Sequence, residues 1–237
     1  EAARKDLFQC PESVANIALL FSRQTRDVYG GNSETFYLDE WRGWPEMLLE
    51  ANVPYDTILD TDLTGDLSRY RLLILPEAAC LSDAQVAGIR RFVKQGGRVI
   101  ATHELAFFDE TGARRGKPAL ADLTSAPPEG FVYHEAKVGA GQLYPIPELE
   151  SGQTETKWQD TRDKAMRQKL LGEVRTAAEP LPWRVAEGGT GVLASVYRVK
   201  NGVLVAHLLN VAPLDLGEHA VICKDRRINY SPTSLPG

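Results

Sequence analysis

Short, unbroken apolar runs alternate with amphipathic stretches over the first half of the chain. The clearest unit spans residues 71–102, where Leu72–Leu75 is apolar throughout and is followed by Pro76. Such a run is typical of a strand that is buried on both faces of a parallel sheet. Residues 98–102, RVIAT, have the same character. The unit therefore predicts a strand, a helix and a second strand.

The helix of this unit is marked at both ends. Ser82 stands three residues before Gln85, which is the spacing of a capping box. Gly96 and Gly97 can adopt positive φ and so end the helix. Between these limits the apolar residues recur at spacings of three and four, at Val86, Ile89, Phe92 and Val93. This spacing places them on one stripe, which predicts a helix that packs on the sheet.

The same alternation extends to both sides of this unit. Apolar runs at residues 16–21 and 55–59 predict two more parallel strands, with a helix between them at residues 36–51. We expect that helix to begin near Trp44, because Pro45 is tolerated in a first turn. Further elements are expected along the chain: strands at 131–134 and 141–146 and the longest helix at 156–175. The pattern indicates an α/β fold with a doubly wound parallel sheet.

The pattern changes near residue 181. Two β-rich runs, 192–199 and 203–209, flank Asn201 and Gly202, a pair that is a strong hairpin signal because both residues accept positive φ. We therefore expect three parts: a helical lead-in or linker at 1–14, an α/β domain at 15–180 and a small antiparallel β module at 181–237.

Composition narrows the class of protein. The chain has 237 residues, is 43% hydrophobic and 25% charged, and carries a formal net charge of −5 without a basic cluster. These values are typical of an ordinary globular protein and argue against a nucleic-acid partner. No apolar run approaches the roughly 20 residues that a membrane span requires. No membrane partner is expected.

Motifs for cofactors and metals are missing from the sequence. It contains no GxGxxG, GxxxxGK[ST], HExxH or CxxC pattern, so no cofactor and no metal site are expected. Cys10, Cys80 and Cys223 are odd in number and far apart. Free thiols in a reducing compartment, the cytoplasm, are the simplest interpretation. Export of a larger precursor stays open, because the sequence lacks an initiating Met and reads as a fragment.

The carboxyl ends of the predicted strands carry the candidate chemistry. Ligands bind outside this edge in open parallel sheets, and the residues expected there are Arg23, Glu77, His103, Glu104 and Asp109. Carboxylates beside a histidine can perform acid–base work. The simpler interpretation, loop solvation and helix capping, is preferred, because fold geometry alone does not assign function.

Several segments, in order, resemble one known domain. These are ANIALLFS, YLDEWRGWPEMLLEANVPYD and LLILPEAACLSDAQVAGIRRFVKQGGRVIATHE, followed by FDETGARRGKPALADL, VGAGQLYPIPEL and NGVLVAHLLN. Together they resemble the trimerisation domain of glycoside hydrolase family 42 β-galactosidases and the start of the small β module that follows it. The resemblance covers residues 16–209.

The resemblance implies a flavodoxin-like fold like that of class I glutamine amidotransferases, without their chemistry. In those enzymes the nucleophilic cysteine lies in the turn after the strand that corresponds to residues 98–102, and here that turn reads Thr102-His103-Glu104-Leu105. In the family 42 enzymes the catalytic carboxylates lie on a separate (β/α)8 barrel, which needs about 250 residues. No catalytic residue is therefore assigned to this chain.

The function implied by the resemblance is that of an accessory domain. It would serve subunit association and support an active site on the barrel, so the expected partners are further copies of the chain, or a barrel of the same precursor, and a carbohydrate. We expect association through the helical faces of the sheet domain, with Leu7 and Phe8 as a further adhesive element. The alternative is a stand-alone carbohydrate-binding protein or hydrolase that uses the strand-end residues.

Overall fold

The computed structural model of the chain describes residues 11–29, 37–138, 143–147, 156–160, 163–187, 192–200, 202–210, 219–223 and 226–230. The centre of the fold is a five-stranded sheet in the order β3-β2-β4-β5-β6, in which all neighbouring strands are parallel. Its strands are β2 (Ile17–Phe21), β3 (Asp56–Leu59), β4 (Leu72–Leu75), β5 (Arg98–Thr102) and β6 (Phe131–His134). This order is flavodoxin-like, and the expected parallel strands are confirmed.

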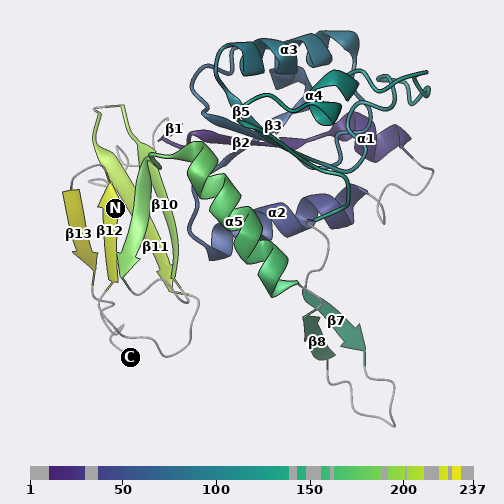
Figure 1. Ribbon diagram of the computed structural model, residues 1–237. Helices are drawn as coiled ribbons and strands as arrows, with labels where there is room; N and C mark the ends of the chain where they lie inside the picture. Colours follow the sequence, from purple (N-terminus) through teal and green to yellow (C-terminus); the bar gives the residue numbers. More distant parts are fainter. Residues whose placement is uncertain are drawn as a thin grey trace.

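Helices cover both faces of this sheet (Figure 1). On one face lie α3 (Asp83–Lys94) and α4 (Ala121–Ser125), and on the other lie α2 (Asp39–Glu50) and α5 (Lys164–Ala178). β4 shows why its sequence is apolar throughout. Leu73 and Leu75 pack with the first helix layer, whereas Leu72 and Ile74 pack with the second. Successive side chains of a strand point to opposite faces, so a strand between two helix layers has no polar side.

The helix α3 begins as its sequence predicts. The Ser82 hydroxyl accepts a hydrogen bond from the Gln85 amide at 3.3 Å, and the Gln85 side chain accepts one from the Ser82 amide at 2.7 Å. These two bonds form the expected capping box. The chain leaves the helix through Gly96, which has a φ of +87°.

The helix α2 differs from the expectation. It begins at Asp39, and Pro45 lies inside it. Contacts outside the helix hold the turns before the proline: the Trp41 indole donates to the Leu20 carbonyl at 3.0 Å, and Trp44 is fully buried. These tertiary contacts offset the hydrogen bond that a proline cannot make.

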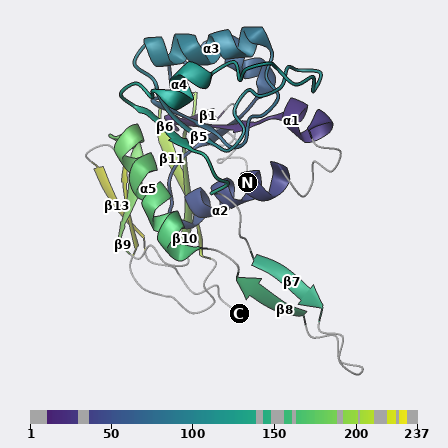
Figure 2. The same ribbon diagram turned by 45° about the vertical axis from the view of Figure 1, so that its right-hand side comes forward.

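The expected long helix at 156–175 is wrong in its first part. Residues Thr156–Asp160 form β8, which pairs antiparallel with β7 (Leu143–Pro147), and α5 begins only after Asp163. The Asp163 carboxylate caps α5 by accepting a hydrogen bond from the Met166 amide at 3.0 Å. Figures 1 and 2 show the β7–β8 ribbon extending away from the sheet domain.

Two small antiparallel sheets follow α5. One contains β1 (Glu12–Ser13), β10 (Val192–Arg198) and β11 (Leu204–Asn210), and the other contains β9 (Trp183–Glu187), β12 (His219–Cys223) and β13 (Arg226–Tyr230). The hairpin between β10 and β11 is confirmed, with Gly202 at a φ of +74°. Glu12–Ser13 was expected in a helical lead-in, but it pairs with β10 as a strand. Residues 1–10 of that lead-in lie outside the described residues.

The short helix α1 (Arg23–Val28) follows β2, and a 3-10 turn at Asp60–Thr64 follows β3. Both lie at the carboxyl edge of the sheet, where the candidate residues were expected. In the part of the chain that the structure describes, no helix combines the length and the apolar character needed to cross a membrane.

Candidate functional site

The turns after β4 and β5 have an unusual backbone. Glu77, His103 and Ala106 have φ values of +39°, +48° and +56°, and among the described non-glycine residues only Asn52 also has a positive φ. This region of φ is unfavourable for residues with a side chain. Strained residues of this kind persist only where surrounding contacts hold them, and they cluster at functional sites.

Glu77 is the buried centre of this edge. Its side chain is fully buried, with Oε1 2.9 Å from His103 Nδ1 and Oε2 2.9 Å from Lys137 Nζ. Burial raises the pKa of the Glu77 carboxyl, and the positive charge of Lys137 and the contact with His103 oppose that rise. The Glu77 amide donates to the Thr102 hydroxyl at 3.1 Å, which fixes the turn to the end of β5.

His103 is held at three places. Its amide donates to the His134 carbonyl at 2.8 Å, its carbonyl accepts from the Tyr133 hydroxyl at 2.6 Å, and its Nδ1 lies against Glu77. The His103 side chain is 31% exposed. A neutral imidazole that donates from Nδ1 to the carboxylate presents Nε2 as an acceptor. The pair Glu77–His103 therefore has the arrangement of an oriented acid–base group.

Glu104 is the next residue along the chain, and its side chain has a hydrogen-bond partner of its own. The Tyr29 hydroxyl donates to Glu104 Oε2 at 2.5 Å. Burial and this carboxylate raise the pKa of the Tyr29 hydroxyl, so it stays protonated as a donor. Glu104 thus lies next to His103 along the chain with one carboxylate oxygen fixed by the tyrosine.

The two other candidate residues do not join this group. The Arg23 side chain is exposed, and its amide donates to Asp60 Oδ2 at 2.6 Å. Asp109 closes its own turn by accepting from the Thr111 hydroxyl at 2.7 Å and from the Ala113 amide at 3.0 Å. The hydrogen bond from Thr111 is the main cause of the lowered pKa of Asp109.

Two members of the group were missed by the sequence reasoning, namely Tyr29 and Lys137. Tyr29 ends the short helix α1 that follows β2, and Lys137 lies three residues after β6. Both positions follow a parallel strand, so the rule that selected Glu77 and His103 would also have selected them. The sequence contains no signal that pairs Lys137 with Glu77.

The group has an acid–base pair, and the one cysteine among the described residues offers it no nucleophile. Cys80 is fully buried, and burial raises the pKa of its thiol to about 12, so it stays protonated and unreactive. Among the described residues, no cluster of three or more His, Cys, Asp or Glu side chains is arranged to hold a metal ion. His103 occupies the turn directly after β5, at a φ of +48°.

Replacing Lys137 by methionine should destabilise the fold in a pH-dependent way. Without this ammonium group the pKa of buried Glu77 rises further above its ordinary value of 4.5. At a pH between these two pKa values, the Glu77 carboxyl is protonated in the native state and ionised in the unfolded state. The free energy of unfolding therefore falls as pH rises through this interval. We expect a loss of about 1–2 kcal/mol at pH 8 that shrinks towards pH 4, measured by urea unfolding.

The control for this variant is Lys137→Arg, which retains the positive charge and should lose much less stability at pH 8. An equal loss for Lys137→Met at pH 4 and pH 8 would mean that the lysine contributes through packing alone.

Fold and site together define a class of protein. The protein is a flavodoxin-like α/β domain in which His103 holds a strained backbone position in the turn after β5. Residues 15–126 match the family model described as the β-galactosidase trimerisation domain. That segment is therefore a trimerisation domain of the type found in family 42 β-galactosidases, and the resemblance noted in the sequence is confirmed.

Several solved structures share the fold of this chain. The β-galactosidase from Bacillus circulans sp. alkalophilus is 14% identical with a TM-score of 0.63, and the match covers 97% of this chain and 42% of that one. The β-galactosidase from Rahnella sp. R3 is 14% identical with a TM-score of 0.58, covering 93% and 40%. An α-L-fucosidase from Paenibacillus thiaminolyticus is 14% identical with a TM-score of 0.56, covering 94% and 44%.

At these identities the matches establish the fold. The chain spans about two fifths of the length of each of these structures, so it corresponds to a part of such proteins. A search of curated proteins found no match.

Proposed function

We propose that this chain is the accessory part of a larger glycosidase of the β-galactosidase type. It holds subunits together and supports an active site on a (β/α)8 barrel that belongs to the same protein. The observation that carries this proposal is the trimerisation-domain match over residues 15–126. Oligomer formation is implied by the name of that domain. The symmetry of the oligomer, the presence of the barrel and the identity of the sugar belong to the proposal.

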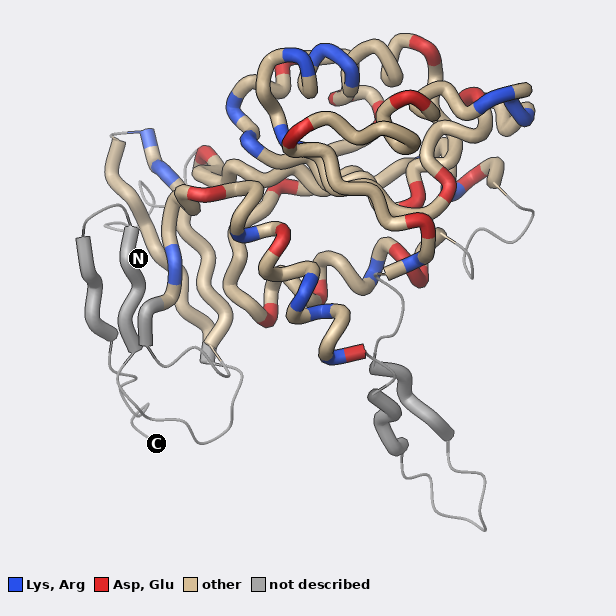
Figure 3. Tube along the Cα trace, in the orientation of Figure 1, with Lys and Arg blue, Asp and Glu red and all other residues tan. Residues whose placement is uncertain are grey.

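The helical faces of the sheet domain are the proposed contact surfaces. In Figure 3, Lys and Arg residues are interspersed with Asp and Glu over the described helices, so neither face carries a single sign of charge that would repel a second copy. A stable interface buries about 1,200–2,000 Å² in total and has an apolar centre. Leu7 and Phe8, proposed as an adhesive element, lie outside the described residues.

Light scattering over a concentration series tests the association. The mass of one chain is 26.2 kDa, and we expect a species of three times that mass to increase with concentration. A monomer at every concentration would remove self-association through this chain from the proposal.

A second candidate function follows from the Glu77–His103 geometry. The pair, with Glu104 beside it, offers an oriented base and a carboxylate to a carbohydrate at the strand ends, as a stand-alone binding protein or hydrolase would need. Arg23 and Asp109 remain in this proposal as outer ligand-facing residues of the same edge. We expect the 237 residues by themselves to release no nitrophenol from a nitrophenyl β-galactoside, because the catalytic carboxylates of family 42 enzymes are proposed to lie on the barrel. Turnover that His103→Gln abolishes would favour the second candidate.

The domain division and the compartment are also proposals. We place an α/β domain at 15–180, a β module at 181–237 and a linker at 1–14. The separated cysteines support a reducing compartment, the cytoplasm.

A further inference from the structure

A pocket lies at the opposite ends of the parallel strands from Glu77 and His103. It has a volume of about 470 Å³ and lies between the sheet domain and the β1–β10–β11 sheet. Residues just before β2 and at the start of β3 line it, including Ala15 and Tyr55. These are the amino ends of the parallel strands, whereas Glu77 and His103 follow the carboxyl ends. The pocket is therefore a separate site.

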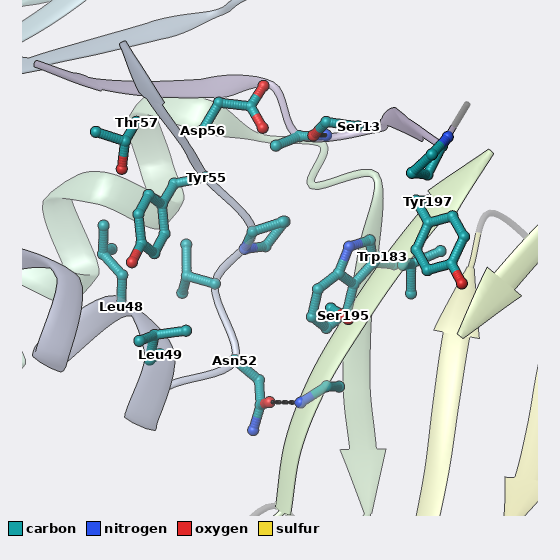
Figure 4. A pocket seen from close by; sticks show the side chains of 16 residues that line it. Ser13, Leu48, Leu49, Asn52, Tyr55, Asp56, Thr57, Trp183, Ser195 and Tyr197 are labelled. Carbon is teal, nitrogen blue, oxygen red and sulfur yellow. Dashed lines mark hydrogen bonds between the residues drawn. The ribbon is translucent and has the colours of Figure 1, made fainter. Parts of the chain in front are cut away.

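The two walls of this pocket are joined by Asn52. Its Nδ2 donates to the Val192 carbonyl at 2.8 Å. Its Oδ1 accepts from the Ala194 amide at 2.8 Å, the bond drawn as a dashed line in Figure 4. The side chain is buried, and the residue has a φ of +50°. Because one amide engages both backbone groups of β10, the walls are fixed before any ligand arrives, which lowers the cost of binding.

The lining is amphipathic. Figure 4 shows Tyr55 and Leu49 on one side of the pocket and Trp183 and Ser195 on the other, with Ser13 near its upper edge. Aromatic and aliphatic side chains of this kind pack against apolar C–H groups. Hydroxyl groups both donate and accept hydrogen bonds. The lining thus suits a ligand that carries both apolar faces and hydroxyl groups.

The lining also has almost no net charge. Among the described residues that line the pocket there is no lysine, arginine or histidine, and Asp56 is the one acidic residue. The Asp56 carboxylate is paired with Arg69 and accepts from the Tyr70 hydroxyl at 3.1 Å. A phosphate or carboxylate would lose its hydration here without gaining a counter-charge. The pocket therefore favours a neutral ligand.

One polar group in the wall lacks a partner. Trp183 is 4% exposed, and its indole Nε1 is buried without a hydrogen-bond acceptor among the described residues. Burying a donor without a hydrogen-bond partner destabilises the fold, because the donor has lost its hydrogen bond to water. The signal of this indole N–H therefore reports on a ligand that packs against the wall.

We propose that this pocket binds a neutral saccharide of one or two rings. Its volume lies within the range of about 300–1,000 Å³ that is usual for small-molecule pockets. The sugar rings would stack against the aromatic walls, and their hydroxyls would meet the hydroxyl groups of the rim. This site goes beyond the proposed role in subunit association, and neither proposal depends on the other.

Calorimetry on the 237-residue chain tests the site with galactose, lactose and galactose 6-phosphate. We expect saturable binding of a neutral sugar with a dissociation constant of about 1 mM or tighter, and at least tenfold weaker binding of the phosphate. The indole N–H signal of Trp183, assigned by its loss in Trp183→Phe, should shift as the neutral sugar binds. Absence of saturable binding for both neutral sugars, or equal binding of the phosphate, would overturn the proposal.

Two variants of β10 form a matched pair for this test. Ser195 and Arg198 are both exposed, but only Ser195 lines the pocket. We expect Ser195→Trp to fill the pocket and weaken binding at least tenfold, and Arg198→Trp to leave it unchanged. Thr57→Trp, on the opposite wall, replaces Ser195→Trp should that variant fail to fold. Binding that survives both pocket substitutions would place the sugar elsewhere and refute the proposed site.

Discussion

Replacing Gly88 by alanine is expected to lower the free energy of unfolding by about 3 kcal/mol. Gly88 lies in α3, where the helix touches the 3-10 turn at Asp60–Thr64. A Cβ atom at this position would overlap the backbone carbonyl oxygen of Leu63 and lie 2.9 Å from its carbon. The obstacle is backbone rather than a flexible side chain, so the helix itself must move, and overpacking of this kind costs about 1–3 kcal/mol or more. Urea unfolding measures the change.

The matched control is Gly172→Ala in α5. Apart from the adjacent backbone of its own helix, a Cβ at Gly172 would meet no described heavy atom within 4 Å, and the residue is exposed. The gain in helix propensity then acts alone, and we expect stability to rise by about 1 kcal/mol. If both substitutions changed stability in the same direction, close packing at Gly88 would not be the cause.

The variant Asn52→Ala is expected to lose about 3 kcal/mol of stability. It removes both hydrogen bonds to β10 and leaves the Val192 carbonyl and the Ala194 amide without these partners, at about 1–3 kcal/mol for each group that stays buried. It also places an alanine at a φ of +50°, which costs about 1 kcal/mol. Faster hydrogen exchange along β10 should accompany the loss, because the clamp between the sheet domain and this strand is gone.

Asn52→Gly separates these two causes. Glycine accepts positive φ but makes neither hydrogen bond, so its loss should be smaller than that of Asn52→Ala by about 1 kcal/mol. Equal losses for the two variants would show that the backbone at residue 52 relaxes without cost.

The parallel sheet was predictable from local patterns. Leu72–Leu75 is apolar at four consecutive positions because each of its faces is covered by a helix layer. The capping box at Ser82 satisfies the backbone of its own helix and needs no distant partner. The Asn201-Gly202 pair similarly predicted the hairpin between β10 and β11, because both residue types accept positive φ.

Errors arose where distant contacts outweighed local signals. Residues 156–160 form β8 because they pair with residues 143–147 in a two-stranded ribbon. The local sequence pattern does not predict that pairing. The helix α2 begins at Asp39 and not near Trp44 as predicted, because Trp41 and Trp44 make contacts with the rest of the domain. Spacing alone does not show which contacts a turn will find.

The candidate site divides in the same way. The topological rule for parallel sheets placed Glu77, His103 and Glu104 at one edge, and the structure brings Glu77 and His103 into contact. The same rule applies to Tyr29 and Lys137, because both follow parallel strands, but nothing in the sequence pairs Tyr29 with Glu104 or Lys137 with Glu77.

The sequence by itself determined the α/β class of the fold, and its resemblance to a known family implied the flavodoxin-like strand order. It also shows that no cysteine follows β5 directly. Each of these depends on the identity or the local pattern of residues. Only the tertiary structure decided the positive φ of Glu77 and His103, the burial of the Glu77 carboxylate and the pocket closed by Asn52. These features depend on groups that are brought together from distant parts of the chain. Their energies come from packing and desolvation, which no single segment contains.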